Sequence, residues 1–121
     1  MSTALIIEDS LTETEVISHC LRRGGLNVET AGSADEGLAK ILNKKPDVII
    51  LDVVLPGRSG FELCRDLKAE TETKTIPVVI CSTKSTEIDK FWGMKQGADA
   101  YLTKPIDQEQ LLRTVKQLLK D

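Results

Sequence analysis

The sequence is poor in residues that bind soft metals or that cross-link secreted domains. It has one histidine and three cysteines among 121 residues: His19, Cys20, Cys64 and Cys81. The cysteines are odd in number, widely spaced and flanked by apolar residues, which favours buried, reduced thiols over disulfides or metal ligands. The histidine falls beside the apolar stripe of a predicted helix, so we expect a surface or boundary residue rather than a phosphorylated one.

The sequence also lacks long apolar runs and an excess of positive charge. No run approaches the length of a membrane span, and the N-terminus meets Glu8 and Asp9 without a preceding basic region, so we expect no signal peptide. We therefore expect a cytoplasmic protein with no membrane span. A net charge of −3 and a pI near 5.2 argue against direct binding of nucleic acid.

What the chain does contain is enough for one globular core. Its 121 residues and 13.3 kDa are typical of a single domain, and 40% of the residues are hydrophobic. We expect residues 1–121 to form one domain with no output domain.

The most informative stretch is an apolar run that ends in a carboxylate. Residues 48–51 are apolar without alternation, Asp52 follows, and Pro56, Gly57 and Gly60 lie in the next loop. This pattern is typical of a strand that is buried on both faces. A carboxylate at the end of such a strand is costly unless a cation meets it.

Strands and helices alternate five times along the chain. The other predicted strands cover residues 4–7, 27–31, 78–81 and 100–103, and predicted helices begin at Ser10, Ser33, Ser59, about Thr86, and Asp107. Polar N-cap residues mark these helix starts. The pattern predicts an α/β, doubly wound (βα)5 fold: a parallel sheet between two helix layers. We expect Leu42 and Phe91 to be buried, and Trp92 to be a boundary residue or an exposed anchor.

The carboxyl ends of parallel strands meet at one edge of a sheet. The side chains expected to converge there are Glu8, Asp9, Asp52, Ser82, Thr83 and Lys104. Three carboxylates and one ammonium leave a charge that a hard divalent cation, Mg²⁺, would balance. A hydroxyl and an amine beside the metal suit a phosphoryl group, and Asp52 is the carboxylate best placed to act as its nucleophile.

These residues, in this order, resemble the receiver domain of two-component response regulators over essentially the whole chain. The matching positions are Glu8, Asp9, Asp52, Pro56, Gly60, Ser82, the run 97–99, Tyr101, Lys104 and Pro105. The resemblance implies a flavodoxin-like three-layer sandwich with the strand order 2-1-3-4-5.

The resemblance also implies roles for the site residues. Asp52 would accept a phosphoryl group from a sensor histidine kinase or a histidine phosphotransfer protein. Asp9, Asp52 and the backbone carbonyl of Val54 would hold Mg²⁺, with Glu8 nearby through water. Lys104 would neutralise the transferred oxygens, and its bond to the following proline would be cis.

Further implied roles concern the response to phosphorylation. Ser82 and Tyr101 would form the switch, remodelling a surface of the fourth helix, fifth strand and last helix that binds a target protein. Val54 and Lys84 occupy positions where the family tunes phosphoryl lifetime, and we hypothesise that Lys84 shields the phosphoryl group from water. Ser82 replaces the threonine that is more usual in the family, so coupling could be looser.

Other functions need weighing. A flavin- or nucleotide-binding module conflicts with the acidic pair Glu8 and Asp9 and with the lack of a glycine-rich loop. A Mg²⁺-dependent phosphatase would need an acid where Val54 stands. We therefore expect a phosphoacceptor that assists its own phosphorylation and dephosphorylation, not an enzyme. We expect the protein to act as a signalling switch, for example in motility or taxis control. The alternative is a phosphate sink or relay intermediate without a target of its own. Tyr101 could also be only a strand aromatic.

Overall fold

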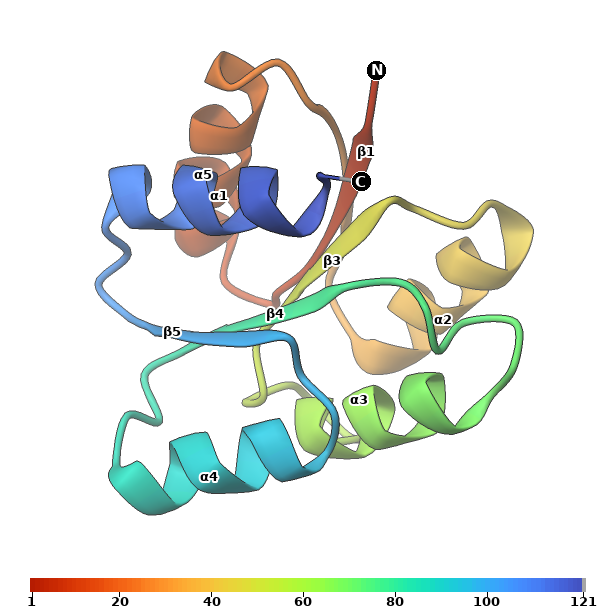
Figure 1. The fold of residues 1–121 in the computed structure, drawn as a ribbon. Coiled ribbons are helices and arrows are strands. Elements are labelled where there is room, and N and C mark those ends of the chain that lie inside the picture. The colour runs from red at the N-terminus through yellow and green to blue at the C-terminus, as the bar shows by residue number, and fades with distance from the viewer. Residues whose placement is uncertain (121) are drawn as a thin grey trace.

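The structure is a computed structural model that describes residues 1–120. Five strands alternate with five helices along the chain (Figure 1). The elements are β1 (Thr3–Ile7), α1 (Leu11–Arg23), β2 (Asn27–Ala31), α2 (Ala34–Asn43), β3 (Val48–Leu51), α3 (Gly60–Ala69), β4 (Val78–Ser82), α4 (Glu87–Lys95), β5 (Ala100–Thr103) and α5 (Gln108–Leu118).

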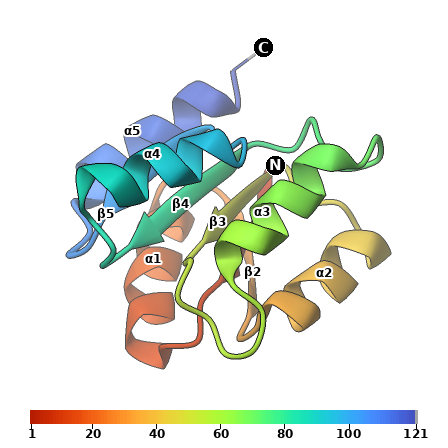
Figure 2. The same ribbon diagram turned by 90° about the horizontal axis from the view of Figure 1, so that it is seen from below.

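The five strands form one parallel sheet in the order β2-β1-β3-β4-β5. Helices α1 and α5 cover one face, and α2, α3 and α4 cover the other (Figures 1 and 2). This arrangement confirms the doubly wound, flavodoxin-like three-layer sandwich and its strand order.

The central strand β3 explains the apolar run that led the sequence analysis. Ile49 and Leu51 pack in the core beneath α2 and α3, whereas Val48 and Ile50 pack in the core beneath α1 and α5. All four side chains are buried. Because helices cover both faces of the sheet, neither set of alternate positions can be polar.

The helix starts use the predicted N-cap residues, with one difference in detail. The hydroxyls of Ser10 and Ser33 accept hydrogen bonds from the backbone N–H groups three residues later. The hydroxyl of Ser59 instead accepts from the Phe61 N–H, 3.0 Å away. The reciprocal pair of bonds of a full capping box forms between Thr86 and Asp89.

Two side chains expected in the core are exposed, so those predictions were wrong. Leu42 is 68% exposed and Phe91 is 65% exposed. In α4 the inward position belongs to Gly93, because the ring of Tyr101 lies where a side chain at Gly93 would stand. With its inner face occupied in this way, α4 turns Phe91 outward.

The predictions for the scarce residues are confirmed. Cys20, Cys64 and Cys81 are free and buried, and burial raises the pKa of the Cys64 thiol to about 11 and that of the Cys81 thiol to about 12. His19 is exposed.

Within residues 1–120, no helix is both long enough and apolar enough to cross a membrane.

Gly60 allows α3 to start close beneath the end of β3. A Cβ atom at this position would lie 2.2 Å from the Asp52 carbonyl oxygen and 2.6 Å from the Val53 Cα, and both atoms belong to the backbone. We predict that Gly60→Ala lowers the free energy of unfolding by about 1–3 kcal/mol, because backbone cannot move aside as a side chain can. Urea denaturation followed by circular dichroism measures this loss.

Gly32→Ala is the matched control, since a Cβ there meets only ordinary contact with Glu36 at 3.6 Å. Equal stability of Gly60→Ala and the parent protein would contradict the close approach of α3 to β3.

Candidate functional site

The carboxyl ends of β1, β3, β4 and β5 bring the predicted site residues to one edge of the sheet. The parallel register aligns Ile7 with Leu51, and Ser82 with Thr103. The ladder continues beyond the strands, since the Asp52 N–H donates to the Ile7 carbonyl at 3.0 Å and the Lys104 N–H donates to the Ser82 carbonyl at 2.9 Å. The residues that follow these strands are therefore fixed by the sheet itself.

Lys104 links the first and third strands through its ammonium group. Its Nζ donates to Glu8 Oε1 at 2.5 Å and to Asp52 Oδ2 at 2.8 Å. All three side chains are at least 93% buried, as their exposed fractions are 7%, 3% and 7% for Lys104, Glu8 and Asp52. The site is thus built around one cation shared by two buried carboxylates, with a formal charge of −1.

Burial and ion pairing have opposite effects on the pKa values of Lys104 and Glu8. Burial alone would lower the pKa of Lys104, but its hydrogen bonds to Asp52 and Glu8 outweigh that effect and leave the pKa raised. For Glu8 burial is the largest effect and raises the pKa, although the bonds from Lys104 and the Ser10 N–H oppose it. The ammonium therefore stays charged at neutral pH.

Backbone groups orient the two carboxylates. The Val54 N–H donates to Asp52 Oδ1 at 2.9 Å, and the Ser10 N–H donates to Glu8 Oε2 at 3.1 Å. Each Asp52 oxygen accepts one hydrogen bond and keeps a further lone pair. Asp52 can consequently act as a ligand or a nucleophile without giving up the bonds that position it.

The other acidic residue of the edge faces solvent. Asp9 is exposed directly after the buried Glu8, and Thr83 is also exposed. Within residues 1–120, no three acidic, histidine or cysteine side chains group closely enough to enclose an ion. Oxygen ligands for a hard cation at this edge would be carboxylates together with a backbone carbonyl, water or a ligand oxygen.

The two predicted switch residues meet at Lys84 in the loop between β4 and α4. Ser82 is fully buried, and its Oγ accepts a hydrogen bond from the Lys84 N–H at 3.2 Å. The Tyr101 hydroxyl donates to the Lys84 carbonyl at 2.5 Å. Burial is the main cause that raises the pKa of Tyr101 to about 12, so the phenol is a neutral donor at physiological pH. One exposed residue thus joins both switch positions through its backbone.

The site also depends on backbone groups and on a glycine that residue type alone did not predict. The N–H groups of Ser10 and Val54, and the carbonyl of Lys84, have no signature in residue type. The position of Gly93 could have been predicted to be special, because a glycine within a predicted helix often marks a place where another part of the chain packs closely. The structure shows that approach, since a Cβ at Gly93 would lie 2.7 Å from the Tyr101 ring. The predicted cis bond between Lys104 and Pro105 is present.

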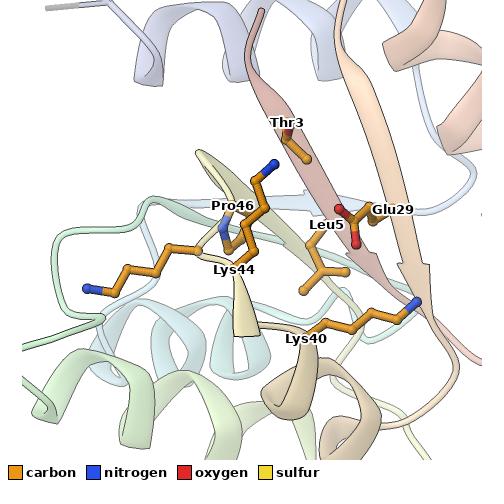
Figure 3. A pocket seen from close by; sticks show the side chains of 7 residues that line it. Thr3, Leu5, Glu29, Lys40, Lys44 and Pro46 are labelled. Atoms are coloured by element: carbon orange, nitrogen blue, oxygen red, sulfur yellow. The ribbon is translucent and has the colours of Figure 1, made fainter. Parts of the chain in front are cut away.

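A separate hollow lies near the amino ends of the strands (Figure 3). Three lysines line it, but the Lys40 amine donates to the Thr30 carbonyl, and the Lys45 amine pairs with Glu72 at 2.7 Å. Two of the three amines that line this hollow are therefore already engaged within the fold.

The sheet order, the buried lysine–aspartate pair and the hydroxyl at the end of β4 are the features of a receiver-type α/β fold. Residues 4–116 match the family model of the response regulator receiver domain, and the chain belongs to that family. It is a receiver domain of two-component response regulators.

Individual relatives agree with this family. The chain is 44% identical to Protein PilH of Pseudomonas aeruginosa over 119 residues, covering 98% of each sequence. Among solved structures, the signal receiver domain of a signal transduction histidine kinase from Syntrophus aciditrophicus matches with a TM-score of 0.91 and 35% identity, over 98% of this chain and 90% of that one. The chemotaxis protein CheY4 of Vibrio cholerae matches with a TM-score of 0.90 and 34% identity over 98% of both chains.

The buried ammonium of Lys104 leads to a prediction about the stability of the fold. We predict that Lys104→Met lowers the free energy of unfolding by about 3–5 kcal/mol at neutral pH, because Glu8 and Asp52 would remain buried without their shared cation. The loss should be smaller in a Glu8→Gln background, where one of the two charges is gone. Urea denaturation of the four proteins of this cycle measures both effects.

Lys116→Met, at an exposed position of α5, serves as the control and should leave stability within about 0.5 kcal/mol. A Lys104→Met protein as stable as that control would show that the ammonium does not compensate the carboxylates.

Proposed function

We propose that the chain is a phosphorylation-activated switch in which Asp52 accepts a phosphoryl group from the phosphohistidine of a histidine kinase or histidine phosphotransfer protein. The observation that carries this proposal is the ammonium of Lys104, held 2.8 Å from Asp52 at the carboxyl edge of the sheet. Membership of the receiver family supports the class of donor.

The transfer balances as a substitution at phosphorus. A carboxylate oxygen of Asp52 forms a bond to phosphorus while the bond from phosphorus to the imidazole nitrogen breaks. The electron pair of that bond stays on the imidazole, which takes up a proton from solvent. The product is an aspartyl phosphate, and Asp52 acts once per donor rather than turning over a free substrate.

Lys104 supplies positive charge where the phosphoryl oxygens arrive. Its Nζ is fixed by two carboxylates before any phosphoryl group enters, so little reorganisation is needed. Preorganised charge of this kind stabilises the transition state of phosphoryl transfer.

Asp9, Asp52 and the Val54 carbonyl are the groups that would hold Mg²⁺, with Glu8 near it through water. The donor set fits a hard cation because all of its atoms are oxygens, and the Val54 carbonyl accepts no hydrogen bond from within residues 1–120. When bound, the ion supplies further charge neutralisation for the phosphoryl oxygens.

The conformational change that follows phosphorylation would pass from the site to the surface through Ser82, Lys84 and Tyr101. To bond a phosphoryl oxygen, the Ser82 hydroxyl turns away from the Lys84 N–H, which loosens the loop whose carbonyl holds Tyr101. Tyr101 then repositions and alters the surface of α4, β5 and α5 that binds a target protein. The phosphoryl group shifts the population between these states through contacts made in only one of them. Similarity to a chemotaxis protein supports taxis or motility control as the process.

The decisive experiment is the intact mass of the protein after incubation with Mg²⁺ and a small phosphodonor such as acetyl phosphate. We predict a gain of one HPO₃ group in the parent protein, none in Asp52→Asn, and none when a chelator removes the metal. A circular dichroism spectrum shows that the variant is folded. Equal phosphoryl uptake by Asp52→Asn and the parent protein would contradict the assignment of Asp52 as the phosphoacceptor.

A second prediction concerns the lifetime of the aspartyl phosphate. Lys84 is exposed two residues after Ser82, where we propose that its side chain shields the phosphoryl group from water. We predict that Lys84→Ala loses phosphate several-fold faster than the parent, measured as release of inorganic phosphate after the donor is removed. Lys90→Ala is the control on the neighbouring helix, and an unchanged rate in Lys84→Ala would refute the shielding role.

A further inference from the structure

The loop between β3 and α3 carries the backbone carbonyl of Val54, which the proposed function assigns to the metal (Figure 2). Two hydrogen bonds fix the ends of this loop. The Val54 N–H donates to Asp52 Oδ1 at 2.9 Å, and the Gly60 N–H donates to the Val53 carbonyl at 3.0 Å. The backbone of residues 55–58 makes no hydrogen bond within the described part of the chain. The middle of the loop must therefore be held by side chains.

The side chain of Arg58 attaches the middle of the loop to α3. Its Nη2 donates to Asp66 Oδ2, and its Nε lies 3.9 Å from Glu62 Oε2. Glu62 is in the first turn of α3, and Asp66 follows it on the same helix. The Arg58 side chain is only 24% exposed, although the loop lies at the surface. The guanidinium is thus packed along the helix rather than extended into solvent.

Arg58 also contributes to an apolar hollow between α2 and α3. The hollow is lined by Arg58 together with Leu38, Leu42 and Leu67. The methylene groups of an arginine can cover apolar surface while the guanidinium keeps its polar partners. An Arg58→Met substitution therefore removes the two ion pairs and keeps an unbranched apolar chain beside the hollow.

An isolated positive charge would be unfavourable at this position. Arg58 directly precedes the N-cap Ser59, so it lies at the positive end of the α3 dipole, where a cation is disfavoured. It also lies in the loop of the proposed metal site, where a positive charge opposes the binding of a divalent cation. Its contacts with Glu62 and Asp66 offset this cost. Those contacts fix the loop, and this effect remains to be assigned a role.

We propose that Arg58 is a positioning residue for the metal site, which holds the loop so that the Val54 carbonyl is in place to bind Mg²⁺. This inference rests on the proposed function, because it takes Val54 as a metal-binding group. Gly57, with a φ of 71°, lies between the two residues and makes the loop flexible unless it is held. A ligand group that is held before binding loses less conformational entropy when the ion arrives.

Other roles for Arg58 predict different effects of its loss. If Arg58 served only the stability of the fold, its loss would not change the affinity of the folded protein for Mg²⁺. If it acted only through its charge, its loss would strengthen Mg²⁺ binding, since a cation would be removed from the neighbourhood of the site. A positioning role predicts weaker binding. The sign of the change in affinity therefore separates the three roles.

Titration of the whole protein with MgCl₂ at constant ionic strength, followed by two-dimensional NMR of the backbone amides, tests the proposal. We expect Arg58→Met to raise the dissociation constant for Mg²⁺ about tenfold, as is typical when a group that orients a metal ligand is removed. The same spectra show whether the variant is folded. Unchanged or tighter binding of Mg²⁺ by Arg58→Met overturns the proposal.

Arg65→Met is the matched control. The Arg65 Nε lies 3.4 Å from Asp66 Oδ1, so this variant also removes a cation from Asp66, but Arg65 belongs to α3 and not to the loop. We expect its affinity for Mg²⁺ to equal that of the parent protein or to be slightly higher. An equal loss of affinity in Arg65→Met and Arg58→Met overturns the role of the loop attachment.

A double-mutant cycle shows whether the pair of Arg58 with Asp66 is the contact responsible. Asp66→Ala should weaken Mg²⁺ binding by a factor similar to that of Arg58→Met. The double variant should bind no more weakly than either single variant, because both substitutions remove the same contact. Factors that multiply in the double variant overturn the assignment to this pair.

Phosphorylation separates this inference from the proposed function. With acetyl phosphate, Arg58→Met should reach the maximal rate of phosphoryl uptake of the parent, but at a higher Mg²⁺ concentration, because Asp52 and Lys104 are unchanged. A parent protein that accepts phosphate, with an Arg58→Met variant of equal Mg²⁺ affinity, would overturn this inference and leave the proposed function intact. A parent that takes up no phosphate, with weakened Mg²⁺ binding in Arg58→Met, would do the opposite.

Discussion

The structure depends on one ammonium group held between two buried carboxylates. Lys104 can reach both Glu8 and Asp52 only because β1, β3 and β5 end at the same edge of a parallel sheet. Isolated burial of any of the three charges would be costly. The ammonium offsets both carboxylates, which otherwise repel each other, and the carboxylates in turn offset the buried ammonium. The fold and the site are therefore not separable: the topology creates the convergence, and the convergence makes charged strand ends compatible with a buried sheet edge.

The strands that position the site are also connected to α4. Lys104 follows β5, whose Tyr101 packs on Gly93 of α4, and Ser82 ends β4 beside it. The Lys84 N–H and carbonyl connect the hydroxyls of Ser82 and Tyr101. A change at Ser82 thus has a short physical path to α4 that consists of two hydrogen bonds and one aromatic contact. The small Gly93 is what brings the ring close enough to the helix for this contact.

Much of the fold and of the site could be predicted because the signals were carried by residue type and order. The unalternating run before Asp52 gave a doubly buried strand, and polar residues at N-caps gave the helix starts. What residue type does not encode was missed, namely the Ser10 and Val54 N–H groups that orient the carboxylates. Phe91 was misplaced because apolar periodicity says which residues share a face but not which face turns inward, and here the Tyr101 ring took the inner place.

The two faces of α4 have different consequences for regulation. Its inner face meets Tyr101, and its outer face exposes Ile88, Phe91 and Trp92, although the helix is only nine residues long. A helix this short moves as a unit, so a change that reaches the outer face does so by displacing the whole element. If phosphorylation displaces α4, any association through the outer face changes, and linkage requires that association alters the phosphorylation equilibrium by the same factor. If α4 stays in place, the two events are independent. The contact between Tyr101 and Gly93 is thus the point at which a displacement of the Tyr101 ring can reach α4.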